Sequence, residues 1–188
     1  MPILGSFAGI SSKAYGLTSN LVGDYFFIAK SDAPTAAVAS LDFSSIPQNF
    51  THLEIRMSVQ NTTAGYFDNR MRLNGDSGAT QYSYAFNFWD GTTNSNTNTT
   101  GQSYIMAGGA SGNNNNNNSI NIIQLQNYTN TNIFKPYSFI NSGYGSAVQR
   151  LQLGAGLYKS GSAITSISLF PSANNFSRYS VAYLYGIK

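Results

Sequence analysis

Few side chains in this sequence can carry acid–base, metal or nucleophilic chemistry. Among 188 residues there are ten Lys or Arg, seven Asp or Glu, one His and no Cys. Enzymes take their acids, bases and nucleophiles mainly from these residue types. The polar positions hold 22 Asn, 25 Ser, 14 Thr and 13 Tyr instead. We therefore predict that the protein is not an enzyme, needs no cofactor, and acts by binding or covering other molecules.

Three residues come nearest to a catalytic pattern: His52, Asp76 and Asp90. His52 lies beside Glu54 and Arg56 without a nucleophile nearby in the sequence, which favours a structural or surface role. Two carboxylates roughly 5–10 Å apart can cleave a glycosidic bond. Asp76 and Asp90, however, each lie in a turn sequence, where Asp commonly binds its own backbone. Zinc needs Cys or His and calcium needs six to eight oxygens, so we predict no metal site.

Aromatic and amide side chains offer another kind of chemistry, the binding of sugars. Rings stack on sugar faces while amides bond to hydroxyl groups, and the candidate glycan contacts are Trp89, Tyr82 and Tyr84. Against this, Tyr82 and Tyr84 alternate in phase with Phe86 and Phe88, which favours their being core residues of one strand. Trp89 is explained least well by core packing, because it lies at the end of this strand beside a polar segment.

Charge and hydropathy indicate which partners to expect. The formal net charge is +3, and no cluster of basic residues could neutralise a row of phosphates. No apolar stretch approaches the roughly 20 residues that span a bilayer, and the first residues lack the segments of a secretion signal. We therefore expect no nucleic acid and no membrane, and synthesis as a soluble protein in a cytosol. Low charge also means weak self-repulsion, which favours assembly.

The first 23 residues are expected to form an extended arm. They contain four Gly residues and show neither a strand period nor a helix period. Their scattered apolar residues are unusual for a free tail and are the predicted contacts with this subunit or a neighbour: Ile3, Leu4, Phe7, Ile10, Tyr15 and Leu17. A frayed terminus is the alternative.

Residues 24–188 are expected to form one domain, an all-β, antiparallel, jelly-roll-like β-sandwich. The clearest pattern is in 51–60, where Leu53, Ile55, Met57 and Val59 alternate with polar residues. No segment shows a sustained helical period. A closed barrel stays an alternative, because alternation indicates faces and not connections. The expected strands are 24–30, 51–60, 67–73, 81–88, 102–107, 120–127, 133–141, 147–158, 163–170 and 178–187.

The turn and loop residues suggest how some of these strands are joined. The turn Asn74–Gly78 predicts a hairpin between 67–73 and 81–88. Two segments rich in Asn, Ser, Thr and Gly, 89–101 and 108–119, are expected to be polar loops and not buried strands.

Three motifs in order carry a resemblance to a known family. They are the segment HLEIR at 52–56, the turn NGDSG at 74–78 and the segment LYGI at 184–187. The chain from about residue 24 to its end resembles tailed-bacteriophage virion structural proteins of the jelly-roll type. In such proteins an HLxIR strand, an NGDxG turn and a C-terminal LYGI strand recur in this order.

The resemblance implies a non-enzymatic component of the virion, made in the cytoplasm of a host bacterium. The first hypothesis is a capsid decoration or cement protein that binds the major capsid protein or other virion proteins through its arm and one sandwich edge. A homotrimer would suit three-fold capsid sites. The second hypothesis is a tail or tail fibre component that binds a host glycan, and the third is a glycan-degrading enzyme that uses Asp76 or Asp90.

Overall fold

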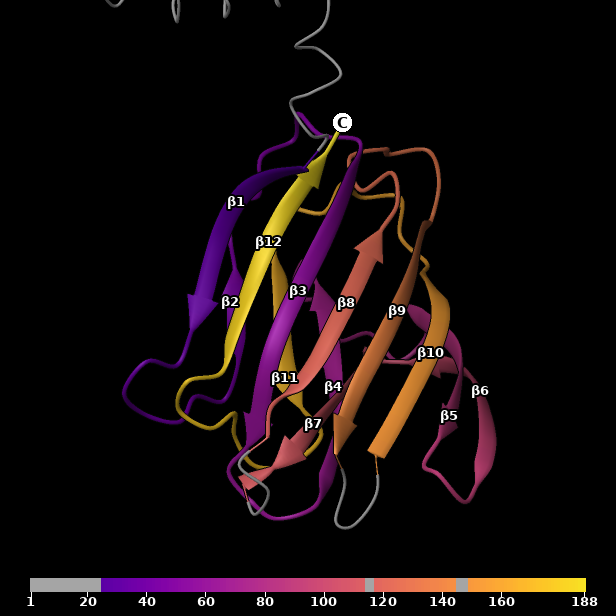
Figure 1. Cartoon of the computed structure of the whole chain (residues 1–188). Coiled ribbons are helices and arrows are strands. Elements are labelled where there is room, and N and C mark those ends of the chain that lie inside the picture. The colour runs from indigo at the N-terminus through magenta and orange to yellow at the C-terminus, as the bar shows by residue number, and fades with distance from the viewer. Residues whose placement is uncertain (1–24, 114–116, 145–148) are drawn as a thin grey trace, which may run out of the picture.

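The computed structural model describes residues 25–113, 117–144 and 149–188, and all its long regular elements are strands (Figure 1). The predicted N-terminal arm lies outside the described residues, so its docking stays a prediction. The strands are β1 (Tyr25–Asp32), β2 (Leu41–Phe43), β3 (His52–Asn61), β4 (Tyr66–Leu73), β5 (Tyr82–Trp89), β6 (Asn94–Gln102), β7 (Ile105–Gly112), β8 (Ser119–Leu125), β9 (Lys135–Tyr144), β10 (Gln149–Tyr158), β11 (Ile167–Pro171) and β12 (Val181–Ile187).

The strands form two layers packed face to face (Figure 1). The larger layer has the order β1-β12-β3-β8-β9-β10-β5-β6, and the smaller has the order β2-β11-β4-β7. A short parallel pairing of β3 with β7, at Gln60–Ser111 and Asn61–Gly112, joins the layers. The expectation of an all-β sandwich is confirmed for the described residues, and the sheet does not close into a barrel. The sheet is mixed and not purely antiparallel, because β3 and β7 run parallel.

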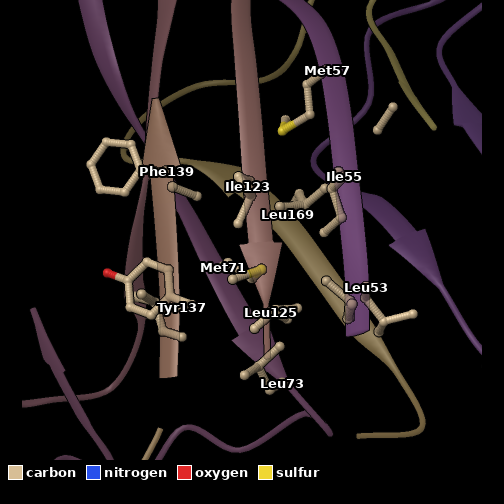
Figure 2. Packing of buried hydrophobic residues seen from close by; sticks show 14 of the residues in the cluster. Leu53, Ile55, Met57, Met71, Leu73, Ile123, Leu125, Tyr137, Phe139 and Leu169 are labelled. Atoms are coloured by element: carbon tan, nitrogen blue, oxygen red, sulfur yellow. The ribbon is translucent and has the colours of Figure 1, made fainter. Parts of the chain in front are cut away.

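The core lies between the two layers and follows the predicted alternation. Leu53, Ile55 and Val59 of β3 are fully buried. Figure 2 shows side chains of β3 and β8 pointing toward Met71 of β4 and Leu169 of β11. Fully burying one such side chain stabilises the folded state by about 1.5–3 kcal/mol, so this interior dominates the stability of the domain.

The hairpin predicted between 67–73 and 81–88 is wrong, although both segments are strands. β4 pairs with β11 and β7, whereas β5 pairs with β10 and β6. The turn at Asn74 carries the chain from the smaller layer to the larger one. The amide of Asn74 binds this turn to a distant segment, because its Nδ2 donates to Ala163 O at 2.8 Å and its Oδ1 accepts from Thr165 N at 2.8 Å.

The two predicted loops are also partly wrong, and the short strand β2 was not predicted. Residues 94–102 form β6, because uncharged Asn, Ser and Thr can form an edge strand that is accessible to solvent on both faces. Residues 108–112 belong to β7, which is buried along its whole length. Small residues allow this burial: a Cβ on Gly109 would overlap the ring of Tyr66.

Two amide side chains take the place of a neighbouring strand beside β7. Gly109 N donates to Asn121 Oδ1 at 3.0 Å, and Asn121 Nδ2 donates to Gly109 O at 3.1 Å. Asn141 Nδ2 donates to the same carbonyl at 3.1 Å and to Asn121 Oδ1 at 2.8 Å. A buried peptide group without a partner would cost about 1–3 kcal/mol, so these amides allow a glycine-rich segment to lie in the interior.

Candidate interaction surface

The two aspartates considered for catalysis bind their own turns. Asp76 Oδ1 accepts from Gly78 N at 2.9 Å, and Asp90 Oδ1 accepts from Thr93 N at 2.8 Å. The backbone N–H groups of Thr93 and Thr92 hold the pKa of Asp90 below its ordinary value. The two aspartates lie beyond opposite ends of β5, whose eight residues span about 23 Å. The turn interpretation is confirmed, and the two carboxylates do not flank one bond.

His52 has a structural contact. Its Nδ1 accepts the backbone N–H of Asn127 at 3.1 Å, which joins the start of β3 to the segment after β8. The predicted structural role is therefore confirmed. Among the residues that the structure describes, no three His, Asp or Glu side chains gather as metal ligands would. Nor does any helix in this part of the chain have the length and apolar character to cross a bilayer.

The three predicted glycan contacts do not lie on one surface. Tyr82 is fully buried, and its ring stacks on Tyr158 with centroids 4.9 Å apart. Tyr84 is also buried, beside Tyr104. Tyr82 and Tyr84 as glycan contacts are therefore wrong, because the β5 face that carries them packs into the sandwich. Trp89, by contrast, is 52% exposed at the end of β5.

The larger layer carries apolar side chains on the side turned away from the core. Ile120 of β8 is 60% exposed and Leu153 of β10 is 51% exposed, although such residues usually lie inside. We call the set that lies together here the outer face. It consists of Ile120, Ile122, Ile140, Leu151, Leu153 and Trp89.

Strand register brings the outer face together from four strands. Ile122 lies opposite Ile140, which lies opposite Leu153, so one apolar row crosses β8, β9 and β10. Leu151 lies opposite Trp89 in the pairing of β10 with β5. Directly opposed side chains on one sheet face are about 5 Å apart, so the row is continuous. A shallow hollow of about 340 Å³ lies along it, lined by Ile122, Ile140 and Leu153 with Gln124 and Ser138 at one side. Apolar side chains that gather on a surface and are rimmed by polar residues are typical of interaction sites.

Beside the outer face, β3 carries an ion pair between Glu54 and Arg56. Glu54 is almost fully buried and accepts three hydrogen bonds, from Arg56 Nε at 2.8 Å, Gln124 Nε2 at 3.0 Å and Tyr25 OH at 3.1 Å. The Arg56 guanidinium lies 5.4 Å from the ring centroid of Tyr25 and 5.2 Å from that of Tyr185. Glu54 and Arg56 therefore neutralise each other beside the rings of Tyr25 and Tyr185.

Glu54 should make the stability of the protein depend on pH. Burial acts to raise the pKa of Glu54, but the hydrogen bonds from Gln124, Arg56 and Tyr25 outweigh it and leave the pKa below its ordinary value. A carboxyl whose pKa is lower in the folded state stabilises the fold above its unfolded-state pKa and loses this contribution as pH falls through its folded-state pKa. Glu54→Gln should therefore weaken the protein at pH 6 more than at pH 3, as measured by urea unfolding. An equal loss at both pH values would contradict this.

Sequence reasoning missed the outer face, although one signal was present. In 120–125 apolar residues occupy both alternating sets of positions, with Ile120 and Ile122 in one and Ile123 and Leu125 in the other. Such a strand is apolar on both sides, so one side must lie on the surface unless another layer covers it.

The sequence matches no protein-family model. A comparison with curated proteins also finds no match. The function is therefore inferred from the surface of the domain and from the three motifs.

Proposed function

We propose that this protein is a non-enzymatic structural component of a bacteriophage virion, most specifically a capsid decoration or cement protein that binds the major capsid shell. The observation that carries the proposal is the outer face, a continuous apolar surface on a domain whose catalytic candidates are all engaged in structural contacts. The three motifs that resemble virion proteins supply the phage context.

The chemistry of the outer face suits permanent attachment. Fully burying an exposed Leu or Ile contributes about 1.5–3 kcal/mol. The four exposed members on β8, β9 and β10 are each about half exposed, so burial of the rest of each side chain contributes roughly half of this, and the four contributions would act together. Around them lie Ser138, Ser142 and Gln124, which can form hydrogen bonds across a contact without the desolvation cost of a charge. Interfaces of this kind combine an apolar centre with a polar rim.

A tail or tail fibre component that binds a host glycan is the second candidate. The observation in its favour is Trp89, a large exposed ring beside the amide-rich strand β6. Aromatic rings and amides together suit sugar binding. The two candidates differ in abundance, since a decoration protein is present at hundreds of copies in a particle and a tail tip protein at few. A stained gel of purified particles separates them.

The attachment surface is tested with Leu153→Asp. Burying a carboxylate without a partner costs several kcal/mol, and each 1.4 kcal/mol is tenfold in affinity. We therefore expect the variant to bind particles that lack the wild-type protein at least about tenfold more weakly. Its melting temperature should be close to that of the wild type, because Leu153 is already half exposed. Bound protein is measured after sedimentation of the particles.

The matched control for Leu153→Asp is Phe134→Asp. Phe134 precedes β9, lies outside the outer face, and is also 51% exposed. This control should bind as the wild type does, since it introduces the same charge away from the contact. Wild-type binding by Leu153→Asp, or equal losses in both variants, would show that the outer face is not the attachment surface.

A further inference from the structure

The sheet edges of this protein differ in how they are protected against pairing with another chain. An edge strand exposes unpaired N–H and C=O groups, and proteins usually block it with charge, proline, bulges or short length. β1, at one end of the larger layer, has Lys30, Asp32 and an irregular register after Phe27. β2, the edge of the smaller layer, has three residues, and the N–H of Asp42 donates to Ser31 Oγ.

β6, at the other end of the larger layer, has none of these protections over most of its length. It is nine residues long, contains no charged residue and no proline, and pairs with β5 along one side. Its register is regular from Asn94 to Thr99, and the only irregularity lies near Gly101. No other described strand pairs with β6, so its second side is an unprotected edge in the described residues.

The hydrogen-bonding pattern shows which groups line this edge. At the turn, Asp90 N donates to Thr93 O at 3.2 Å, so these two residues form a hydrogen-bonded pair. Such pairs alternate along an antiparallel ladder. Ser95, Thr97 and Thr99 therefore exchange hydrogen bonds with β5. The N–H and C=O groups of the intervening residues, Asn94, Asn96 and Asn98, point away from β5 toward the edge.

We propose that β6 pairs antiparallel with β6 of a second copy of this chain, about a two-fold axis. Three features favour a copy of the same chain. The strand carries no charge that would repel its equal, and its exposed asparagines all lie on one face of the sheet. In an antiparallel pairing centred on Asn96, Asn94 lies opposite Asn98, so amide meets amide on that face.

The geometry of the pairing sets the size of the assembly. Each copy contributes the same edge, so one pairing covers the unprotected edges of both chains. No such edge is then left for a third chain, and the assembly is a dimer. It also joins the larger layers of two copies into one sheet whose outer faces lie on the same side. This inference does not depend on a phage role, and it predicts a dimer where three-fold capsid sites would suit a trimer.

The experiment compares Asn96→Pro with Asn96→Ala in the full chain. Proline removes the N–H that points to the edge and leaves the hydrogen bonds to β5 in place, which is the position where edge strands tolerate proline. Alanine removes only the side chain and keeps the backbone edge. By light scattering after gel filtration, the wild type and Asn96→Ala should have twice the chain mass of 20.3 kDa, and Asn96→Pro the mass of one chain.

A second variant covers the case in which Asn96→Pro fails to fold, as judged by circular dichroism. The double change Asn96→Lys and Asn98→Lys keeps every backbone group and gathers four positive charges at the centre of the pairing, where position 96 of one copy lies opposite position 96 of the other, so it should also give the mass of one chain. A monomeric wild type, a trimeric wild type, or equal masses for the wild type and the double lysine variant would overturn the proposal.

Discussion

Deletion of Leu184–Lys188 is expected to unfold the domain. These residues form most of β12, which lies between β1 and β3 in the larger layer and pairs with both. Leu184 is fully buried, and Gly186 packs against the ring of Phe50. The deletion leaves two neighbouring strands without their ladder partner and opens the core, in a domain whose net stability is about 5–15 kcal/mol. Circular dichroism should show no cooperative melting transition.

Deletion of Lys188 alone is the control for this truncation. Lys188 follows the last strand and is exposed, and its Nζ lies 5.2 Å from the ring centroid of Phe26. Such an exposed contact contributes about 0.5–1 kcal/mol, so this variant should melt within a few degrees of the wild type. A truncated protein lacking Leu184–Lys188 that stays soluble and melts cooperatively would show that β12 is dispensable.

The second large effect is expected for Gly112→Ala at the end of β7. A Cβ at this position would lie 2.5 Å from Thr63 O and 2.7 Å from Gly65 O, which are backbone atoms that cannot rotate away. Gly112 N also donates to Gly65 O at 2.7 Å, so the two segments are held together at this point. We expect a loss of about 3 kcal/mol or more in the free energy of unfolding, measured by urea titration.

Gly91→Ala separates steric overlap from backbone conformation. Gly91 lies in the turn between β5 and β6 with a φ of 88°, and nothing lies within 4 Å of an added Cβ. Its replacement should cost about 1 kcal/mol, from the left-handed backbone alone. Equal losses of unfolding free energy in Gly91→Ala and Gly112→Ala would contradict this prediction. They would mean that the segments around Gly112 can move apart at little cost.

The outer face and the β6 edge are separate surfaces with separate tests. Leu153→Asp changes a side chain in the middle of the larger layer, whereas Asn96→Pro changes a backbone group at its end. A wild-type protein that dimerises but does not bind particles would refute the proposed attachment and leave the edge pairing intact. The opposite result would refute the pairing and leave the attachment intact.

Prediction from the sequence succeeded where the alternation of apolar and polar residues was enough to tell which side of a strand is buried. Leu53 and Ile55 alternate with polar residues, and both are buried, because a side chain on a strand has only two faces to choose from. The same alternation favoured the core for Tyr82 and Tyr84 and did not explain Trp89. In the structure Tyr82 and Tyr84 are buried and Trp89 is exposed. The turn roles of Asp76 and Asp90 followed from local sequence, since an Asp bonds to backbone groups two or three residues away.

Prediction failed where segments far apart in the sequence decide the outcome. The turn between β4 and β5 predicts that they pair with each other, but β4 pairs with β11 and β5 pairs with β10, which both lie much further along the chain. Residues 108–112 of β7 carry the glycine and serine that predict a loop, although they are buried in a strand. Their burial depends on Asn121 and Asn141, which satisfy a peptide group from other strands.

The sequence by itself determined that this is an all-β protein with few of the residue types from which enzymes take acids, bases and nucleophiles. Residue composition and the alternation of apolar residues along a strand can both be read from the sequence alone. The tertiary structure alone decided which strands are neighbours and therefore which side chains share a surface. Ile122, Ile140 and Leu153 are separated along the chain and become one apolar row only through the register of three strands. The edge of β6 is likewise a property of the sheet order. A binding surface is made of residues that are close in space, and these need not be close along the chain.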